Sequence, residues 1–381
     1  MEAFAGSGGP GLRAMNTRAV LKVLVDAAAP VKVTEITPLL GLTRPTVEAA
    51  LGDLTDGPWV EDMPPEPTPN RSGRRAKRYR FRSEAAHVMG IDVGPHSVTC
   101  LVSDLAGSVV HTEQVRYDDH GDAGTAWSTI QEVVARSIES AGLDRVLAAT
   151  IGVPAVVGPD GEIAYSAVVP SWLQAGIPRR IQAEFPADAT YFDNDVKLAT
   201  LAESEWGEVV GVPHAIFLLA GHQLGAGLVV NGTLARGANG AAGEIGALRL
   251  VDWASAPRQL VAALDGRITP DEIFTRAAAG DPECAAAAAL FASDIAEGVA
   301  ALALAVDPEV IVVAGDAALG GAAFLEPLRR RLDDLCLSTP RLVVSSLGGR
   351  SVALGALARS IAHVRGTVLQ LPETNGTARA H

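Results

Sequence analysis

The sequence predicts an α/β protein in which a small, mainly helical domain precedes a larger body of alternating strands and helices. Short apolar runs of strand length alternate with patterns of helical period from residue 87 to the C-terminal region. Residues 1–85 carry a net charge of +2 and the rest of the chain carries −15, which indicates two parts with different partners. The stretch from Leu219 to Gly246 holds eight of the 39 glycines, a density that indicates tight turns or the close approach of another group.

Length and composition limit the class of protein further. A chain of 381 residues is long enough for two or three domains, and 48% hydrophobic content with 4% aromatics is typical of a globular protein. The N-terminus lacks a basic stretch followed by an apolar core, and no run of about 18 apolar residues is present, so we expect a cytoplasmic protein with no membrane partner. Three cysteines without zinc spacing, Cys100, Cys284 and Cys336, are expected to be buried free thiols.

The N-terminal region predicts a DNA-binding domain preceded by a loose end. Residues 1–15 are rich in glycine and poor in apolar anchors, so we expect them to be disordered. Residues 16–83 predict a winged helix-turn-helix domain. Its first helix is capped by Asn16 or Thr17 and keeps apolar residues at helical spacing to about Ala28.

Two further helices complete the predicted helix-turn-helix. A short helix runs from about Thr34 to Gly41, although Pro38 is unfavourable within it. Thr43 caps the third helix, whose apolar residues Val47, Leu51 and Leu54 line one face. The start of this helix is expected to enter the major groove, with Arg44 as the candidate for guanine recognition. The predicted groove contacts are Thr43, Arg44, Pro45 and Thr46.

A basic strand then predicts a wing. Trp59 and Val60 begin one strand, a proline-rich loop follows, and the chain returns with Tyr79 and Phe81 alternating with arginines. A basic strand alone is typical of a solvated face, but next to a helix-turn-helix it favours contacts with phosphates of double-stranded operator DNA. The basic residues are Arg71, Arg74, Arg75, Lys77, Arg78, Arg80 and Arg82.

The first part of the body reads as a strand meander followed by alternating helices and strands. From His87, three strands form the meander, and the first ends at Asp92 before a glycine turn. A helix over about Thr125–Ala141, a buried strand, and a hairpin at Asp160-Gly161 follow. A strand over 189–194 then carries Asp193 and Asn194 at its carboxyl end, and Asp195 follows it at the start of a helix.

The glycine-rich stretch and the segments after it complete the body. Within the stretch, Leu228–Val230 predicts a strand and Asn231-Gly232 a two-residue turn. A ligand cradle and a plain glycine-rich hairpin are both compatible with this spacing. Two further strands are expected over 309–315 and 341–347. Further helices are expected over 256–264, 269–278, 282–306, 321–332 and 351–364, followed by a flexible tail over 366–381.

These features together resemble the sugar-kinase, Hsp70 and actin superfamily and, more narrowly, the ROK family of repressors and sugar kinases over residues 15–365. The ROK hairpin signature GxGIxxxGxLxxGxxGxAGExGH is followed from Gly225 to Gly246. The resemblance implies a two-lobed actin/sugar-kinase-like (RNase H-like) body with a first lobe at 87–205 and a second at 206–365. The winged helix is similar to that of the repressor branch, with Gly73-Arg74-Arg75 where its Gly-Arg-Pro motif is found.

The chain departs from ROK kinases where ATP phosphates bind. Side chains replace glycines in the two phosphate loops, and a carboxylate follows a later strand where a Gly-Gly pair is usual. Both changes disfavour a polyphosphate. We therefore expect neither ATP as a cofactor nor kinase activity. The three segments are Asp92-Val93-Gly94-Pro95-His96-Ser97, Gly221-His222-Gln223-Leu224-Gly225 and Ala314-Gly315-Asp316.

The sugar site implied by the resemblance is only partly present. Asp195 has the position of the family's catalytic base and is expected to be vestigial, because the phosphate loops are not kept. A helix N-cap is an equally good account of an aspartate at this point. Lys197 stands where kinases usually have Asn, and Val168-Val169-Pro170-Ser171-Trp172 lacks the sugar-binding amide of the family. The ligand-binding residues expected from the resemblance are Asn194, Asp195 and Glu244.

The zinc ligands of the family are missing. Ala247 replaces the histidine that follows the Ala-Gly-Glu triplet, and no cysteines occur in the segment after it, so we expect no zinc and no other metal.

The sequence therefore predicts a transcriptional regulator, a repressor of the ROK type. We expect a homodimer or homotetramer that binds operator DNA and senses a small sugar-like ligand without phosphorylating it. Two alternatives stay open: an active ATP-dependent sugar kinase with a DNA-binding head, and a regulator that uses its body only for oligomerisation.

Overall fold

The computed structural model describes residues 10–64, 77–117, 122–166 and 168–370, apart from Asp252 and Ala254. Their contacts form two compact units. The first contains the described residues up to Val88, with Ser103–Val109 and the end of the chain from Ile361 on. The second contains Met89–Val102 and Val110–Ser360. We call the first unit the head and the second the body.

The head is built from three helices and a three-stranded antiparallel sheet of order β1-β3-β2. Its apolar core joins the inner faces of the three helices to Val60, Tyr79 and Phe81 of the sheet. Gly41 ends the second helix in the left-handed conformation, which a glycine adopts without strain. The elements are α1 (Pro10–Asp26), β1 (Val31–Lys32), α2 (Val33–Leu40), α3 (Arg44–Thr55), β2 (Val60–Met63), β3 (Arg78–Phe81) and the 3-10 turn η1 (Ser83–Ala85).

The first helix begins earlier than predicted. It starts at Pro10, so the expectation of disorder over 1–15 is wrong for residues 10–15; residues 1–9 lie outside the described part of the chain. Arg13 forms an ion pair with Asp53 of α3, and the hydroxyl of Thr17 donates to the carbonyl of Arg13 within the helix. Thr17 therefore lies inside α1 and does not cap it, because contacts with α3 extend the helix towards the N-terminus.

The end of the chain also differs from the prediction. Helix α12 (Ser351–Thr367) continues beyond residue 365, and Leu369 is 4% exposed within the same apolar cluster as Leu21 and Leu24 of α1. The predicted flexible tail is thus wrong for residues 366–370, while residues 371–381 lie outside the described chain. Arg18 also donates to Gln370. The polar composition of this segment predicted a loose tail, although its Leu369 is buried in the head core.

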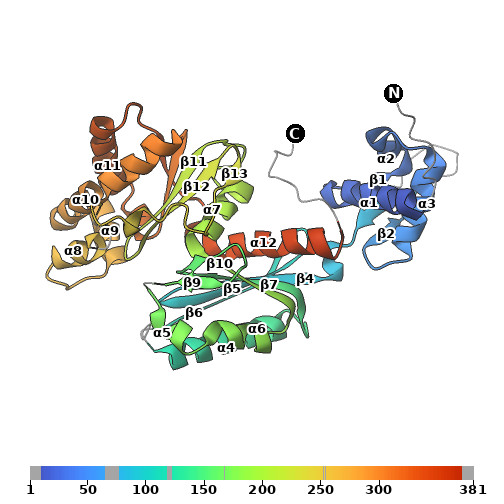
Figure 1. Ribbon diagram of the computed structural model, residues 1–381, viewed down its shortest axis with the longest axis horizontal. Helices are drawn as coiled ribbons and strands as arrows, with labels where there is room; N and C mark the ends of the chain where they lie inside the picture. The colour runs from blue at the N-terminus through green and yellow to red at the C-terminus, as the bar shows by residue number, and fades with distance from the viewer. Residues whose placement is uncertain are drawn as a thin grey trace. The chain divides into compact units, whose positions relative to one another are not determined.

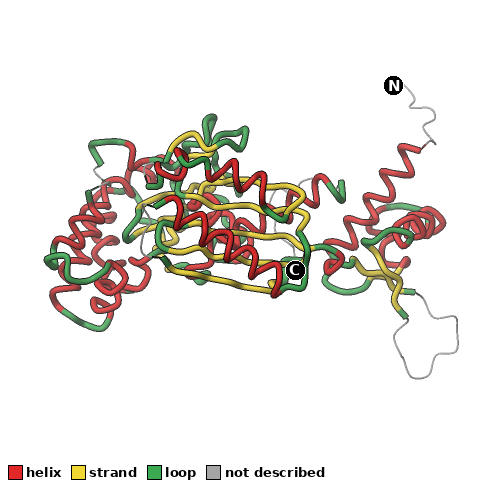
Figure 2. Tube along the Cα trace, turned by 90° about the horizontal axis from the view of Figure 1, so that it is seen from below, coloured by secondary structure: helices red, strands yellow, loops and turns green. Residues whose placement is uncertain are grey.

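The first lobe of the body is a five-stranded sheet of order β10-β7-β4-β5-β6, with helices on both faces (Figure 1). Helices α4 and α6 pack through Trp127, Ile130 and Ile181 on one face. Seen from below in Figure 2, helices lie across these strands. The elements are β4 (His87–Val93), β5 (Ser97–Asp104), β6 (Val109–Arg116), α4 (Ala123–Ser140), β7 (Val146–Val153), β8 (Val156–Val157), β9 (Ile163–Tyr165), α5 (Pro170–Gln174), α6 (Ile177–Glu184) and β10 (Ala187–Asn194).

Residues 351–360 of α12 pack on the other face of this first-lobe sheet, which corrects their predicted place in the second lobe. A Cβ on Gly90 of β4 would lie 2.3 Å from the carbonyl oxygen of Ala353, so glycine is needed for this approach. The hydroxyls of Thr150 and Ser360 are 2.8 Å apart, and Ser360 donates to the carbonyl of Met89. The chain crosses back to the first lobe because small residues on β4 and β7 leave room for the helix backbone.

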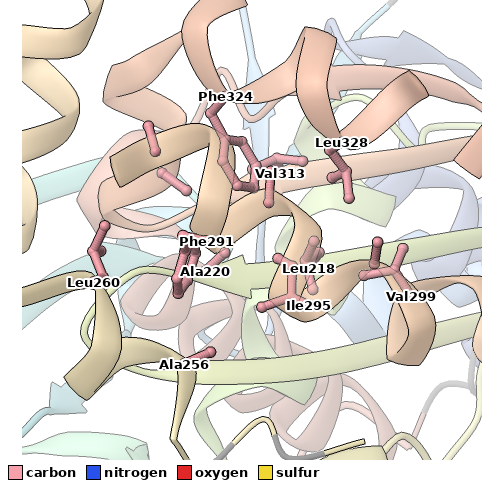
Figure 3. Close-up of a cluster of buried hydrophobic side chains, with 14 of the residues drawn as sticks. Leu218, Ala220, Ala256, Leu260, Phe291, Ile295, Val299, Val313, Phe324 and Leu328 are labelled. Carbon is pink, nitrogen blue, oxygen red and sulfur yellow. The ribbon is translucent and has the colours of Figure 1, made fainter. Parts of the chain in front are cut away.

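The second lobe is a sheet of order β13-β12-β11-β14-β15, and four helices bury a large apolar core against one of its faces (Figure 3). On the other face, Val196 and Ala199 of helix α7 pack against β11 and β14. The elements are α7 (Asp195–Trp206), β11 (Ala215–Ala220), β12 (Leu224–Val230), β13 (Thr233–Leu234), η2 (Ile245–Ala247), α8 (Ala256–Ala262), α9 (Pro270–Ala278), α10 (Pro282–Val306), β14 (Val310–Ala314), η3 (Asp316–Gly320), α11 (Ala322–Leu335), β15 (Arg341–Val344) and η4 (Gly348–Arg350).

These two α/β lobes and the preceding head confirm the predicted fold class. The predicted hairpin is present, with Asn231 and Gly232 both at positive φ between β12 and β13. Helix α10 is long and apolar enough to cross a membrane by length and composition, which the sequence inspection did not anticipate. Half of its most apolar window is buried in the body, as in the core helix of a globular domain.

Truncation of Leu369 should loosen the head. Leu369→Ala removes a buried side chain and should cost about 2–4 kcal/mol, because the surrounding core collapses only partly. Hydrogen exchange of the α1 amides in the full chain measures this loss. Val368→Ala is the matched control, since Val368 is 44% exposed. Equal exchange in the two variants would show that the end of the chain contributes nothing to the head core.

Candidate functional site

The predicted ligand residues lie where β10 passes into α7. The side-chain oxygen of Asn194 accepts from the backbone N–H of Lys197 at 2.9 Å, so Asn194 caps α7. Asp195 is the first residue of the helix. The N-cap account of Asp195 is therefore wrong, because its neighbour performs that role. The Asn194 amide donates to the carbonyl of Ala155 and to Asp195 Oδ1.

The carboxyl of Asp195 is held in place and largely removed from water. Its Oδ1 accepts from the Val196 backbone N–H at 2.8 Å and from Asn194 at 3.1 Å, and no hydrogen bond is recorded for Oδ2 among the described residues. Burial raises the pKa of Asp195 to about 7, and the nearby charge of Glu244 adds to the rise. Burial, with Asp195 nearby, also raises the pKa of Asp92 to about 8. Asp195 and Asp92 therefore each gain or lose a proton near neutral pH.

Lys197 brings a positive charge to the same place. It is 2% exposed, and its ammonium donates to the carbonyl of Gly240 in the glycine-rich loop. Burial lowers the pKa of Lys197, while Glu244 and Asp193 oppose that change. Lys197 therefore ties α7 to the loop that carries Glu244.

The backbone of that loop requires its glycines. Gly243 has φ +87°, and a Cβ there would lie 2.1 Å from the carbonyl oxygen of Ala226. Gly240 has φ +75°, and a Cβ there would lie 1.9 Å from the carbonyl oxygen of Val157. Glu244 adds to the raised pKa of Asp195 and opposes the lowered pKa of Lys197, so its charge is felt at both residues. Glu244 itself is exposed to solvent.

A buried ion cluster supports this site, and the sequence did not reveal it. Asp193 is 1% exposed, and its carboxylate receives two hydrogen-bonding contacts of 2.8 Å from Arg236. Arg359 of α12 also pairs with it. Burial would raise the pKa of Asp193, but the two arginines outweigh it and hold that pKa below its usual range. No local pattern indicates this cluster, because Arg236 and Arg359 are distant in sequence.

The segments that correspond to the kinase phosphate loops contact one another. His222 Nδ1 lies 2.7 Å from Asp316 Oδ2, and the His222 backbone N–H donates to the same oxygen at 2.8 Å. A Cβ on Gly221 would lie 2.3 Å from this oxygen. The ring of His96, from the turn between β4 and β5, packs edge-on against His222 with centroids 5.3 Å apart.

The His222–Asp316 pair is electrostatically matched. Burial opposes protonation of His222, but the bond to Asp316 outweighs it and raises the pKa of His222. The same bond overcomes the effect of burial on Asp316 and lowers its pKa. An open groove of about 820 Å³ adjoins His222, lined mainly by α8 and the turn before α9. The backbone N–H of His222, which would face a phosphate in the kinase arrangement, is already engaged by a carboxylate.

The predicted groove contacts of the head lie at the start of α3. Thr43 caps this helix through Thr46 N–H, and Thr43, Arg44 and Pro45 are exposed while Thr46 is half-buried. Arg44 pairs with Glu48 one turn on, at 2.8 Å, and both side chains are accessible. Arg44 can exchange this exposed partner for another acceptor at small cost, since such pairs contribute little.

The predicted wing is more neutral than its sequence indicated. Lys77 pairs with Asp62 at 2.6 Å, Arg80 pairs with both Glu61 and Glu84, and Arg78 donates to the carbonyl of Pro64. Glu61 of β2 lies opposite Arg80 of β3, and Asp62 of β2 pairs with Lys77 just before that strand. Arg71, Arg74 and Arg75 lie outside the described residues.

Replacing Asp195 with Asn should make the body more stable than wild type, by an amount that grows as the pH rises. The folded pKa of about 7 exceeds the ordinary value of 3.8, so wild-type stability falls as pH rises between these values. Asn stays neutral and can accept the same two hydrogen bonds. The variant's advantage in thermal unfolding should therefore grow from pH 4 to pH 8, reaching about 4 kcal/mol. Asp334→Asn, at an exposed position, should show no such growth; a constant Asp195→Asn effect would contradict the raised pKa.

Similarity to known proteins agrees with this architecture. The family model described as ROK family matches residues 88–258 and 255–361. The xylose repressor of Caldicellulosiruptor bescii is 25% identical over 95% of this chain and 98% of its own length. A glucokinase of Halalkalibacterium halodurans is 22% identical over 70% of this chain and 92% of its own. A crystal structure of a ROK family transcriptional regulator, a homologue of the E. coli MLC protein, shares the fold with a TM-score of 0.67 and 18% identity, covering 92% of this chain and 96% of that one. The chain belongs to the ROK family.

Proposed function

We propose that this chain is a DNA-binding transcriptional regulator of the ROK type that acts as a repressor in the cytoplasm. The observation that carries the proposal is the match to a xylose repressor along almost the full length of both chains, head included. The exposed start of α3, with Arg44 at its first helical position, supports contact with bases in the major groove. We further propose a homodimer or homotetramer on an operator with two-fold symmetry.

The body, in this proposal, senses a small sugar-like ligand without phosphorylating it. Asn194 and Asp195 lie hydrogen-bonded at the end of β10, the charge of Glu244 raises the pKa of Asp195, and carboxylates are good acceptors for sugar hydroxyls. The bond between His222 and Asp316 supports the loss of ATP binding. A polyphosphate would have to displace it and then approach the Asp316 carboxylate.

The ion cluster at Asp193 offers a route from this pocket to the DNA-binding head. Arg236 belongs to the loop that carries Glu244, while Arg359 belongs to α12, whose residues from Ile361 on are part of the head unit. A ligand that moves the loop would change how the two arginines share one carboxylate. Such a ligand alters operator affinity only as far as it binds two arrangements of the chain with different affinity.

A second candidate function, an active sugar kinase, is favoured by one observation. Asp195 keeps the position of the family base, and its pKa of about 7 suits a residue that accepts a proton at neutral pH. A body used only for oligomerisation is the third candidate. A thermal-shift screen of sugars separates it from a sensor, because a ligand at about a hundred times its Kd adds about 2.7 kcal/mol to stability.

Arg44→Ala should weaken specific DNA binding. Operator fragments are first selected from genomic DNA with the full chain, and affinity is then measured by gel shift between about 50 and 200 mM salt. Loss of one bidentate base contact should cost about 1–3 kcal/mol on the selected fragment and much less on random DNA. Arg330→Ala, at an exposed site on α11, is the control. Equal weakening on both DNAs would remove Arg44 from base recognition.

The full chain should not turn over ATP with sugars. A coupled ADP assay across pentoses, hexoses and amino sugars should give the same background for wild type and Asp195→Asn, because the His222–Asp316 bond closes the phosphate loops. Turnover in the wild type that disappears in Asp195→Asn would establish the kinase reading instead.

A further inference from the structure

The segment from Glu244 to Ala256 does not fit the zinc site that the family resemblance implied. Ala247 offers no ligand atom where a histidine is usual, and no cysteine occurs between Glu244 and Ala256. Throughout the described residues, no three His, Cys, Asp or Glu side chains lie together as a metal site would require. Contacts other than metal ligands therefore hold this segment, which begins with the proposed ligand residue Glu244.

Trp253 joins this segment to helix α10 of the second lobe. It is 2% exposed, and its indole N–H donates to the carbonyl of Ile295 in α10 at 3.2 Å. The ring sits against Gly298, where a Cβ would lie 2.4 Å from Nε1 and 2.6 Å from Cε2 of Trp253. Glycine is unfavourable inside a helix, so its presence in the middle of α10 is explained by this ring.

Neighbouring residues extend the same contact. The Cγ1 atom of Val251 would lie 2.5 Å from a Cβ on Gly298, so Val251 fills the other side of the gap. Ile245 and Val251 also pack on the second-lobe core. Leu248 and Leu250 face outward, the latter 87% exposed. Among the described residues of the segment, Ile245, Val251, Trp253 and Ala256 pack on this core, and Trp253 has the largest of these side chains.

Short-range hydrogen bonds connect this anchor to the pocket. The backbone N–H of Ala247 donates to the carbonyl of Glu244 at 3.1 Å, that of Leu248 to Ile245 at 3.0 Å, and that of Val251 to Leu248 at 3.0 Å. These turns link Val251, which packs beside Trp253 at Gly298, to Glu244.

We propose that the Trp253 ring seated on Gly298 is a metal-free replacement for the zinc anchor and that Trp253 is a positioning residue for Glu244. The role of Glu244 rests on the proposed ligand-sensing function. The anchor does not, because its contacts are complete without a ligand, and it is tested here without one.

The test uses the full chain and two readouts of the segment: amide hydrogen exchange over 244–256 and the rate of trypsin cleavage after the exposed Arg249. In Gly298→Ala the new Cβ displaces the indole, and both rates should rise about tenfold or more, against the gain expected from helix propensity. Gly52→Ala in α3 is the matched control, since a Cβ there meets nothing within 4 Å. It should leave both rates unchanged.

A size exchange identifies the contact itself. Trp253→Phe removes the part of the ring, Nε1 and Cε2, that a Cβ at residue 298 would strike. The double variant Gly298→Ala/Trp253→Phe should therefore exchange and be cleaved more slowly than Gly298→Ala alone, a coupling that merely additive damage would not give. Rates in the double variant equal to or above those of Gly298→Ala would overturn the proposal.

A test of metal dependence is independent of these variants, because it uses only the wild-type chain. Treating the wild-type chain with EDTA or 1,10-phenanthroline, or adding zinc, should change neither readout. Faster cleavage after chelation, or slower cleavage after zinc addition, would show that a metal holds the segment and that the Trp253 anchor is wrong. A chain that binds no operator or sugar would leave these results intact, so the two proposals fail separately.

Discussion

The body depends most on the buried carboxylate of Asp193. A single charge at 1% exposure is strongly unfavourable, and removing its partners from such a site costs about 3–5 kcal/mol. Two arginines satisfy it, one from the glycine-rich loop and one from α12, so the end of β10 becomes the point at which three distant segments must meet. Asn194 and Asp195, the proposed ligand residues, follow Asp193 directly in the chain, so the ion pairs of Asp193 also fix their position.

Glycines allow these segments to approach closely. Gly225 and Gly227 of β12 face Val196 and Thr200 of α7, at distances where a Cβ would overlap either side chain. Gly355 of α12 does the same for the backbone of Leu198, where a Cβ would lie 1.7 Å from its carbonyl oxygen. Helix α7 is therefore clamped between the second-lobe sheet and α12. A ligand contacting its first turn acts on a helix that both neighbours hold firmly.

The body has ionisable carboxyl groups at the proposed ligand residues, and the loop at His222 bonds to Asp316 within the body. Burial raises the pKa values of Asp195 and Asp92 to about 7 and about 8. His222 is bonded through its ring and its backbone N–H to Asp316, the contact on which the proposed loss of ATP binding rests. The segment from Glu244 to Ala256 lacks the zinc ligands implied by the resemblance, and Trp253 packs on Gly298 of α10.

The sequence by itself determined the features that arise from neighbouring residues. Thr43 as a helix cap, Gly41 as a helix end, the Asn231-Gly232 turn and the apolar periods of the strands all act within a few positions, and each appears in the structure as predicted. Only the tertiary structure decided which distant groups meet. The pairing of Asp193 with Arg236 and Arg359, the place of Leu369 in the head core and the seating of Trp253 on Gly298 join residues that are tens to hundreds of positions apart. Such contacts depend on packing and desolvation between segments, for which a single sequence carries no local periodicity.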